Sequence, residues 1–107
     1  MRRLHIAIAV ADIEASVKDY STRFGYEPVL VVPDEYALWR MPGLNLSIRK
    51  SQEGIGIVRH LGWEDDAASE FTTDIDINGI FWETFSASQQ AEEIRKAWPE
   101  TDYQPEC

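Results

Sequence analysis

Three side chains of this sequence have the chemistry of metal ligands: His5, His60 and Glu83. Each lies in a segment with the pattern of a β-strand, next to small residues or opposite an apolar face. Glu83 shares its strand face with Phe81 and Phe85, where an ionised carboxylate without a partner costs several kcal/mol. Two neutral imidazoles and one carboxylate suit a divalent metal and leave positions open for water, oxygen or a substrate, as in the facial triad of non-haem Fe(II) enzymes.

The same three residues also have a purely structural interpretation. A single histidine in a strand is more often a hydrogen-bonded core residue than a ligand, and a single glutamate in a strand more often faces solvent. The three residues match no short local metal-binding motif. Because the register between strands cannot be derived from this sequence, both interpretations stay open at this point.

The sequence lacks the motifs of phosphate binding and of nucleophilic catalysis. Gly54-Ile55-Gly56 has neither the third glycine nor the lysine of a phosphate-binding loop, and Ser47 has no nucleophile-elbow context. We therefore expect no organic cofactor. The single cysteine, Cys107, excludes an intrachain disulfide.

The first half of the chain, residues 1–50, has the pattern of a β-α-β-β-β module. Apolar residues alternate along 4–10, which predicts a strand with His5 on its less apolar face. Asp12 and Gly25 are suited to begin and end a helix over 13–24. Further strands are predicted over 27–32, 36–41 and 44–49.

The second half, residues 57–98, is shorter. A strand is predicted over 57–63, followed by an acidic loop that includes Glu64. Asn78-Gly79 between two β-rich segments predicts a hairpin of strands 71–77 and 80–86. Ser86 and Gln89 fit a capping box that begins a helix over 87–98. The sequence therefore predicts an α+β fold with a mostly antiparallel sheet.

Composition and charge limit the function. The chain has 107 residues and 44% hydrophobic residues, which suits a single domain spanning 1–107. Its formal charge of −9 makes nucleic acid and membrane surfaces poor partners and favours cations, either a metal ion or a basic small molecule. No segment has the pattern of a signal peptide or of a membrane-spanning helix, so we expect a cytoplasmic protein.

Three segments resemble vicinal oxygen chelate proteins, the superfamily of glyoxalases, bleomycin-resistance proteins and extradiol dioxygenases. The segment His5–Ser16, continued by Tyr20 and Phe24-Gly25-Tyr26, resembles the opening of these proteins. Arg59–Trp63 resembles the strand that opens their second module, and Asp76–Glu83 resembles their closing hairpin. The resemblance implies a single glyoxalase-like domain in which a curved sheet forms a cup.

The resemblance also implies a function. His5, His60 and Glu83 stand where many relatives have metal ligands, so the chain is expected to bind Fe, Mn, Ni or Zn. It would then be a small-molecule enzyme of lyase, dioxygenase or transferase type. The glyoxalase I-like members take a fourth ligand from the fourth strand, where this chain offers only Asn45, Ser47 and Arg49.

The second module is abridged relative to the superfamily, because few residues separate His60 from Glu83. Single-module relatives complete their pocket as homodimers, so a homodimer is expected here. The alternative function is a metal-free small-ligand binding protein of the bleomycin-resistance type, and a third is an interaction module without a small-molecule site. The residues predicted to line a ligand pocket are Tyr36, Trp39, Arg49, Trp63 and Phe81.

Overall fold

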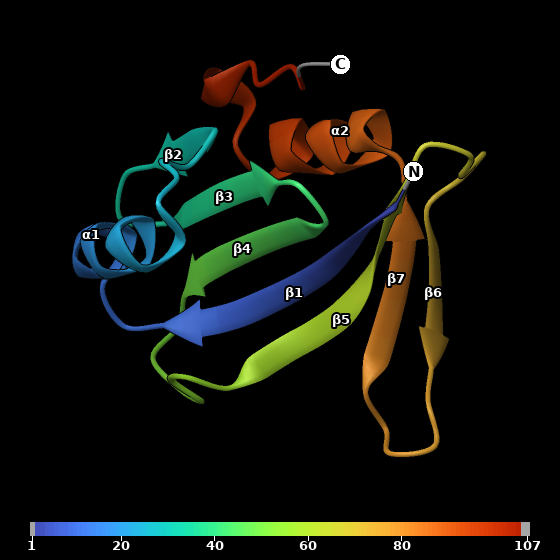
Figure 1. Ribbon diagram of the computed structural model, residues 1–107, viewed down its shortest axis with the longest axis horizontal. Coiled ribbons are helices and arrows are strands. Elements are labelled where there is room, and N and C mark those ends of the chain that lie inside the picture. Colours follow the sequence, from blue (N-terminus) through green and yellow to red (C-terminus); the bar gives the residue numbers. More distant parts are fainter. Residues whose placement is uncertain (1, 106–107) are drawn as a thin grey trace.

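Seven strands form one mixed sheet in the computed structural model, which describes residues 2–105 (Figure 1). The strand order is β2-β3-β4-β1-β5-β7-β6, and the fold is α+β as predicted. The strands are β1 (Arg2–Val10), β2 (Leu30–Val32), β3 (Tyr36–Met41), β4 (Leu44–Lys50), β5 (Val58–Asp65), β6 (Thr72–Ile75) and β7 (Phe81–Phe85). The helices are α1 (Ile13–Phe24), α2 (Ala87–Ala97) and the short 3-10 helix η1 (Pro99–Thr101).

The first half forms the predicted β-α-β-β-β unit. Helix α1 has the predicted bounds, because the Asp12 side chain accepts a hydrogen bond from the Ala15 N–H and Gly25 ends the helix at φ 72°. Strand β4 returns to lie parallel to β1. Strand β2 begins at Leu30 and not at residue 27 as predicted. Pro28 lies in the missing part, and proline has no N–H to contribute to a strand ladder.

The second half pairs β5 antiparallel with β1 and parallel with β7. In Figure 1 the sheet twists strongly, so that β6 and β7 run at a steep angle to β3 and β4. The Asn78-Gly79 hairpin is confirmed, although its strands are shorter than predicted: the Asp76 carboxylate accepts the N–H groups of Asn78 and Ile80 and ends the ladder at Ile75. Helix α2 begins with the predicted capping box of Ser86 and Gln89.

The two longer helices cover opposite faces of the sheet. Helix α1 packs on one face, with a core that includes Val10, Ile13, Trp39 and Ile48. Helix α2 and Tyr103 pack on the other face against β3. Within residues 2–105, no helix combines the length and the apolar character needed to cross a membrane.

Strand β1 separates these two layers. Its apolar side chains Ile6, Ile8 and Val10 belong to the core on the α1 side. His5, like Ala7 and Ala9 next to it, is buried. The less apolar face of this strand is therefore deeply covered, and a histidine there must find polar partners inside the protein.

Candidate metal centre

The histidines and Glu83 converge because three neighbouring strands hold them in register. His5 on β1 pairs with Gly62 on β5, and Gly62 pairs with Glu83 on β7. His60 lies two residues before Gly62, on the same face of β5. The Nε2 atoms of His5 and His60 are 3.0 Å apart, and His60 Nε2 is 3.0 Å from Glu83 Oε1. One ligand atom from each of the three residues lies within 4.8 Å of the others.

Gly62 allows this close arrangement. A Cβ atom at this position would lie 2.1 Å from the backbone oxygen of Glu83, far inside van der Waals contact. Only glycine therefore lets β7 approach β5 with the observed register. The glycine brings the backbone of Glu83 next to the strand that carries His60.

The distances fit a divalent cation. Two ligand atoms that each lie about 2.1 Å from a metal and subtend a right angle are about 3.0 Å apart. Both the His5–His60 and the His60–Glu83 separations have this value. An imidazole Nε2 carries at most one proton, so a single hydrogen on His60 Nε2 would have to serve both His5 Nε2 and Glu83 Oε1 as acceptors. A cation would instead bind both nitrogens and the carboxylate at once.

Asn45 fixes the tautomer of His5. Asn45 Nδ2 donates to Glu64 Oε1 at 2.9 Å and to Gln90 Oε1 at 2.8 Å, which orients the amide. Its Oδ1 atom therefore faces His5 Nδ1 at 2.9 Å, and that nitrogen must donate. The Nε2 atom of His5 is left with its lone pair directed at His60. Histidine ligands of metals are commonly oriented in this way by a hydrogen bond to the other ring nitrogen.

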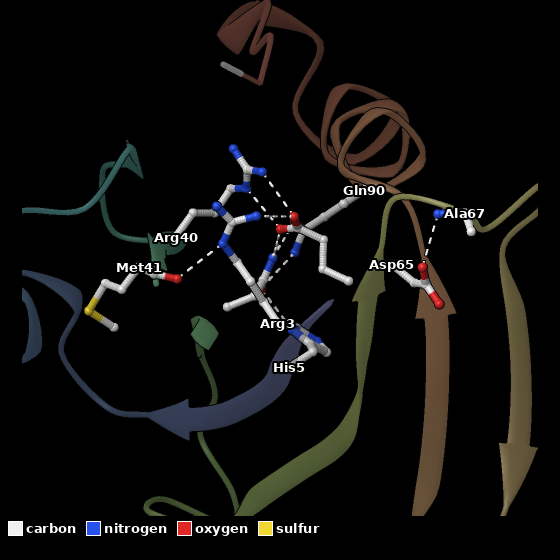
Figure 2. A network of polar contacts seen from close by, with 9 residues as sticks. Arg3, His5, Arg40, Met41, Asp65, Ala67 and Gln90 are labelled. Atoms are coloured by element: carbon white, nitrogen blue, oxygen red, sulfur yellow. Dashed lines mark hydrogen bonds and ion pairs between the residues drawn. The ribbon is translucent and has the colours of Figure 1, made fainter. Parts of the chain in front are cut away.

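Behind Asn45, a buried carboxylate binds two arginines. Glu64 is 1% exposed, and its oxygens accept from Arg3 Nη1 at 2.6 Å, Arg40 Nε at 2.8 Å and Arg40 Nη2 at 2.9 Å. Figure 2 shows Arg3, Arg40 and Gln90 converging on this network, with His5 at its other end. Burial raises the pKa of Glu64, but the hydrogen bonds from Arg40 and Asn45 and the charges of both arginines outweigh it and lower the pKa to about 2.

The prediction that Glu64 lies in a solvated loop is wrong. Strand β5 extends to Asp65, beyond its predicted end at 63, so Glu64 belongs to the strand. Asp66, two residues after Glu64, is exposed. A usable signal was present: Glu64 follows His60 and Gly62 at intervals of two and therefore shares their face.

His5 is suited to remain neutral. Burial lowers the pKa of His5 and the neighbouring His60 lowers it further, while the hydrogen bond to Asn45 only partly offsets these effects. Neutral imidazole is the form that binds metal ions. His5 also packs edge-on against the ring of Phe85, with the ring centres 5.0 Å apart.

A cavity of about 370 Å³ opens beside the three ligand atoms. Of the predicted pocket residues, Tyr36 and Arg49 line it together with both histidines and Glu83. Its wall also includes side chains that were not predicted: Arg59, Phe71, Phe85, Gln90 and Trp98. Trp98, from the end of α2, packs against Tyr36 with the ring centres 4.8 Å apart.

The other three predicted pocket residues lie elsewhere. Trp39 is fully buried on the α1 side of the sheet, because the alternation of β3 places it opposite Tyr36 and Leu38. The ring of Trp63 contacts the Arg2 guanidinium, whose central carbon is 4.2 Å from the ring centre. Phe81 begins β7 and is half exposed, outside the residues that line the cavity.

One curated relative shares sequence with much of the chain. The chain is 38% identical over 73 residues to the trivalent organoarsenical cleaving enzyme of Bacillus sp. (strain MD1). The match includes 65% of this chain and 45% of the relative, so the chain spans less than half the relative's length. No protein-family model matches the chain. The similarity is consistent with a protein like the vicinal oxygen chelate proteins.

Solved structures share the fold. A hypothetical protein from Staphylococcus aureus superposes with a TM-score of 0.59 at 12% identity, over 79% of this chain and 34% of that one. A chain described as NAD-dependent benzaldehyde dehydrogenase from Legionella pneumophila has a TM-score of 0.55 at 12% identity, over 78% of this chain and 97% of that one. At this identity the similarity concerns the fold alone.

Proposed function

We propose that this chain is a metal-dependent enzyme of the vicinal oxygen chelate type that acts on a small molecule. His5, His60 and Glu83 would hold the metal. The observation that carries the proposal is the convergence of their ligand atoms, with both neighbouring separations at 3.0 Å and His5 Nε2 presented by Asn45. The relative from Bacillus, which is named as an enzyme, supports it.

The donor set limits the metal. Two imidazoles and one carboxylate suit Fe(II), Mn(II), Ni(II) or Zn(II) and leave coordination positions for a substrate. When bound, such an ion supplies a Lewis acid that polarises a substrate oxygen.

The residues around the metal ligands would bind and orient the substrate. Phe71, Phe85 and Trp98 provide apolar walls for a substrate in the cavity. Burial raises the pKa of Tyr36 strongly, so its hydroxyl stays protonated and can donate a hydrogen bond into the cavity.

The substrate of the relative is not carried over to this chain. Trivalent arsenic is a soft centre that prefers thiolate ligands, and this sequence contains one cysteine, Cys107, which lies outside the described residues. The described wall of the cavity contains no thiol. We therefore propose a substrate that binds the metal through oxygen.

Metal stoichiometry tests the proposal. Protein purified without a histidine tag or chelator is loaded with each of the four ions, and its metal content is measured by mass spectrometry. We expect about one ion per chain, and loss of that ion in His60→Ala and Glu83→Ala. Glu92→Ala, which removes an exposed carboxylate of α2 away from the cavity, is the matched control. Loaded protein is then screened for turnover of dioxygenase, isomerase and thiol-transfer substrates.

The alternative gives a different result. A metal-free binding protein would take up no ion, and each variant would lose the same folding stability with and without added ion. Equal metal content in wild type, His60→Ala and Glu83→Ala would show that the ion binds elsewhere, and would contradict the assignment of the ligands.

We also propose that the chain works as a homodimer. Apolar side chains are exposed along the β6–β7 hairpin, where Ile77 is 99% exposed and Ile75 and Phe81 are about half exposed. Strand β6 is also an edge of the sheet, with one side unpaired among the described strands. Exposed apolar residues at an unpaired edge favour association with another chain.

A further inference from the structure

Two arginines of the cavity form no ion pair with any acidic side chain that the structure describes. Most other arginines are engaged: Arg3 and Arg40 bind Glu64, and Arg23 binds Asp19. Within residues 2–105, neither Arg49 nor Arg59 forms an ion pair, although both line the cavity beside the metal ligands. Two unpaired positive charges in one cavity are notable in a chain whose formal charge is −9.

A β-bulge places Arg59 in the cavity. Arg59 precedes His60, and regular alternation would direct the two side chains to opposite faces of the sheet. The register shifts at this point: Ala7 pairs with His60, whereas Ile8 pairs with Val58. Arg59 is therefore the extra residue of a bulge, and both Arg59 and His60 line the same cavity. Bulges commonly redirect a side chain next to a functional site.

Arg49 reaches the cavity from β4. It shares the strand face of Asn45 and Ser47, and it is paired in register with Tyr36 on β3. Its guanidinium carbon lies 5.1 Å from the ring centre of Trp98. Contact with an aromatic face holds a guanidinium in place while its N–H groups remain free to donate.

The acidic groups of the cavity contact other side chains and form no ion pair with these arginines. Glu83 contacts His60, and Glu93 lies 4.0 Å from Lys96 on the same helix. The other titratable side chains of the wall are His5 and Tyr36. Neither carboxylate forms an ion pair with Arg49 or Arg59, so a ligand with a negative group would meet two guanidinium groups that are free to bind it.

We propose that the cavity binds a small molecule carrying an oxyanionic group, a carboxylate or a phosphonate, that Arg49 and Arg59 hold at one end. This inference rests on the proposed function, because the other end of the molecule would present its oxygens to the metal. The planar fork of arginine matches such oxyanions with paired hydrogen bonds. This proposal differs from the expectation from net charge, which favours a basic small molecule.

The test uses probes that separate the two ends. The monohydroxamates of succinate, glutarate and adipate each have a metal-chelating hydroxamate and a free carboxylate, and their amide-capped forms are neutral. Their dissociation constants are measured by calorimetry on Mn(II)-loaded protein. For at least one length we expect the carboxylate to bind roughly tenfold more tightly than the amide, as for a hydrogen bond between charged groups.

Variants of the two arginines test whether these side chains cause the preference for the carboxylate over the amide. In the double variant Arg49→Gln and Arg59→Gln, we expect it to fall to about twofold or less while metal content and amide affinity stay unchanged. Arg23→Gln, on α1 and away from the cavity, should keep the wild-type preference. Equal binding of carboxylate and amide at every length in loaded wild-type protein would overturn the inference and leave the metal centre intact.

If no metal binds, a second measurement tests the anion site in the metal-free protein. In that case the proposed function fails, and glutarate and methylphosphonate are titrated into the metal-free protein. The side-chain nitrogens of Arg49 and Arg59 are followed by NMR. Shifts in both resonances that saturate would support the anion site, and the absence of shifts up to millimolar ligand would overturn it.

Discussion

Replacing Glu64 with glutamine should reveal how strongly the buried carboxylate stabilises the fold. Glu64→Gln keeps the shape of the side chain but leaves Arg3 and Arg40 without their counter-charge. The pKa of Glu64 lies at about 2 in the folded protein, against an ordinary value of 4.5. At pH 7 this difference corresponds to about 3 kcal/mol of unfolding free energy, and breaking a buried ion pair typically costs a similar amount.

The lowered pKa also determines how the stabilisation by Glu64 changes with pH. Because folding lowers the pKa, the contribution is fully present above about pH 4.5 and is lost as the pH falls toward 2. The free-energy difference between wild type and Glu64→Gln should therefore be about 3 kcal/mol at pH 7 and about half of that by pH 3. Taking the difference between the two proteins cancels the contributions of the other carboxylates to the pH dependence.

Urea unfolding of metal-free protein, followed by tryptophan fluorescence, measures this difference. Glu92→Gln, an exposed carboxylate of α2, is the matched control and should remain close to wild type at both pH values. A Glu64→Gln protein within about 1 kcal/mol of wild type at pH 7 would refute the reasoning. A difference that is the same at pH 7 and pH 3 would also refute it, because the stabilisation would then not come from the charge.

Two further predictions concern the site and the association of chains. Asn45→Leu removes the acceptor that orients His5. We expect the metal affinity, measured by calorimetry, to fall by roughly 10- to 100-fold. Unchanged affinity in a folded variant would show that Asn45 does not orient His5. Ile77→Asp places a charge at the exposed tip of the hairpin, and we expect sedimentation to show a shift from dimer to monomer without loss of folding. A wild type that is monomeric at high concentration would rule out the homodimer.

Local signals in the sequence were sufficient for most elements of the fold. The caps Asp12, Gly25 and Ser86 act within a few residues, and they set the helix ends as predicted. Asn78-Gly79 correctly predicted the hairpin because a turn depends on adjacent residues. Strand ends were less well predicted, since they depend on which partner strand continues the ladder.

The site depends on information that local patterns do not contain. His5, His60 and Glu83 were predicted as candidates from their residue types, but their convergence follows from the register of β1, β5 and β7. The bulge at Arg59 reverses the expected face of one side chain, and no local pattern indicated it. Trp39 was predicted to line the pocket because a tryptophan in a strand can stack a flat ligand. Strand β3 is apolar on both faces, so its sequence does not indicate which face meets the cavity.

The row of His5, Gly62 and Glu83 across three strands has a consequence for the order of synthesis. Its first member stands near the start of the chain, and its last member is separated from it by most of the described residues. A chain emerging from the ribosome presents its N-terminal half first. The proposed ligand set is therefore incomplete until β7 has been made and paired with β5, and β1 must pair correctly before a bound metal could contribute to its stability.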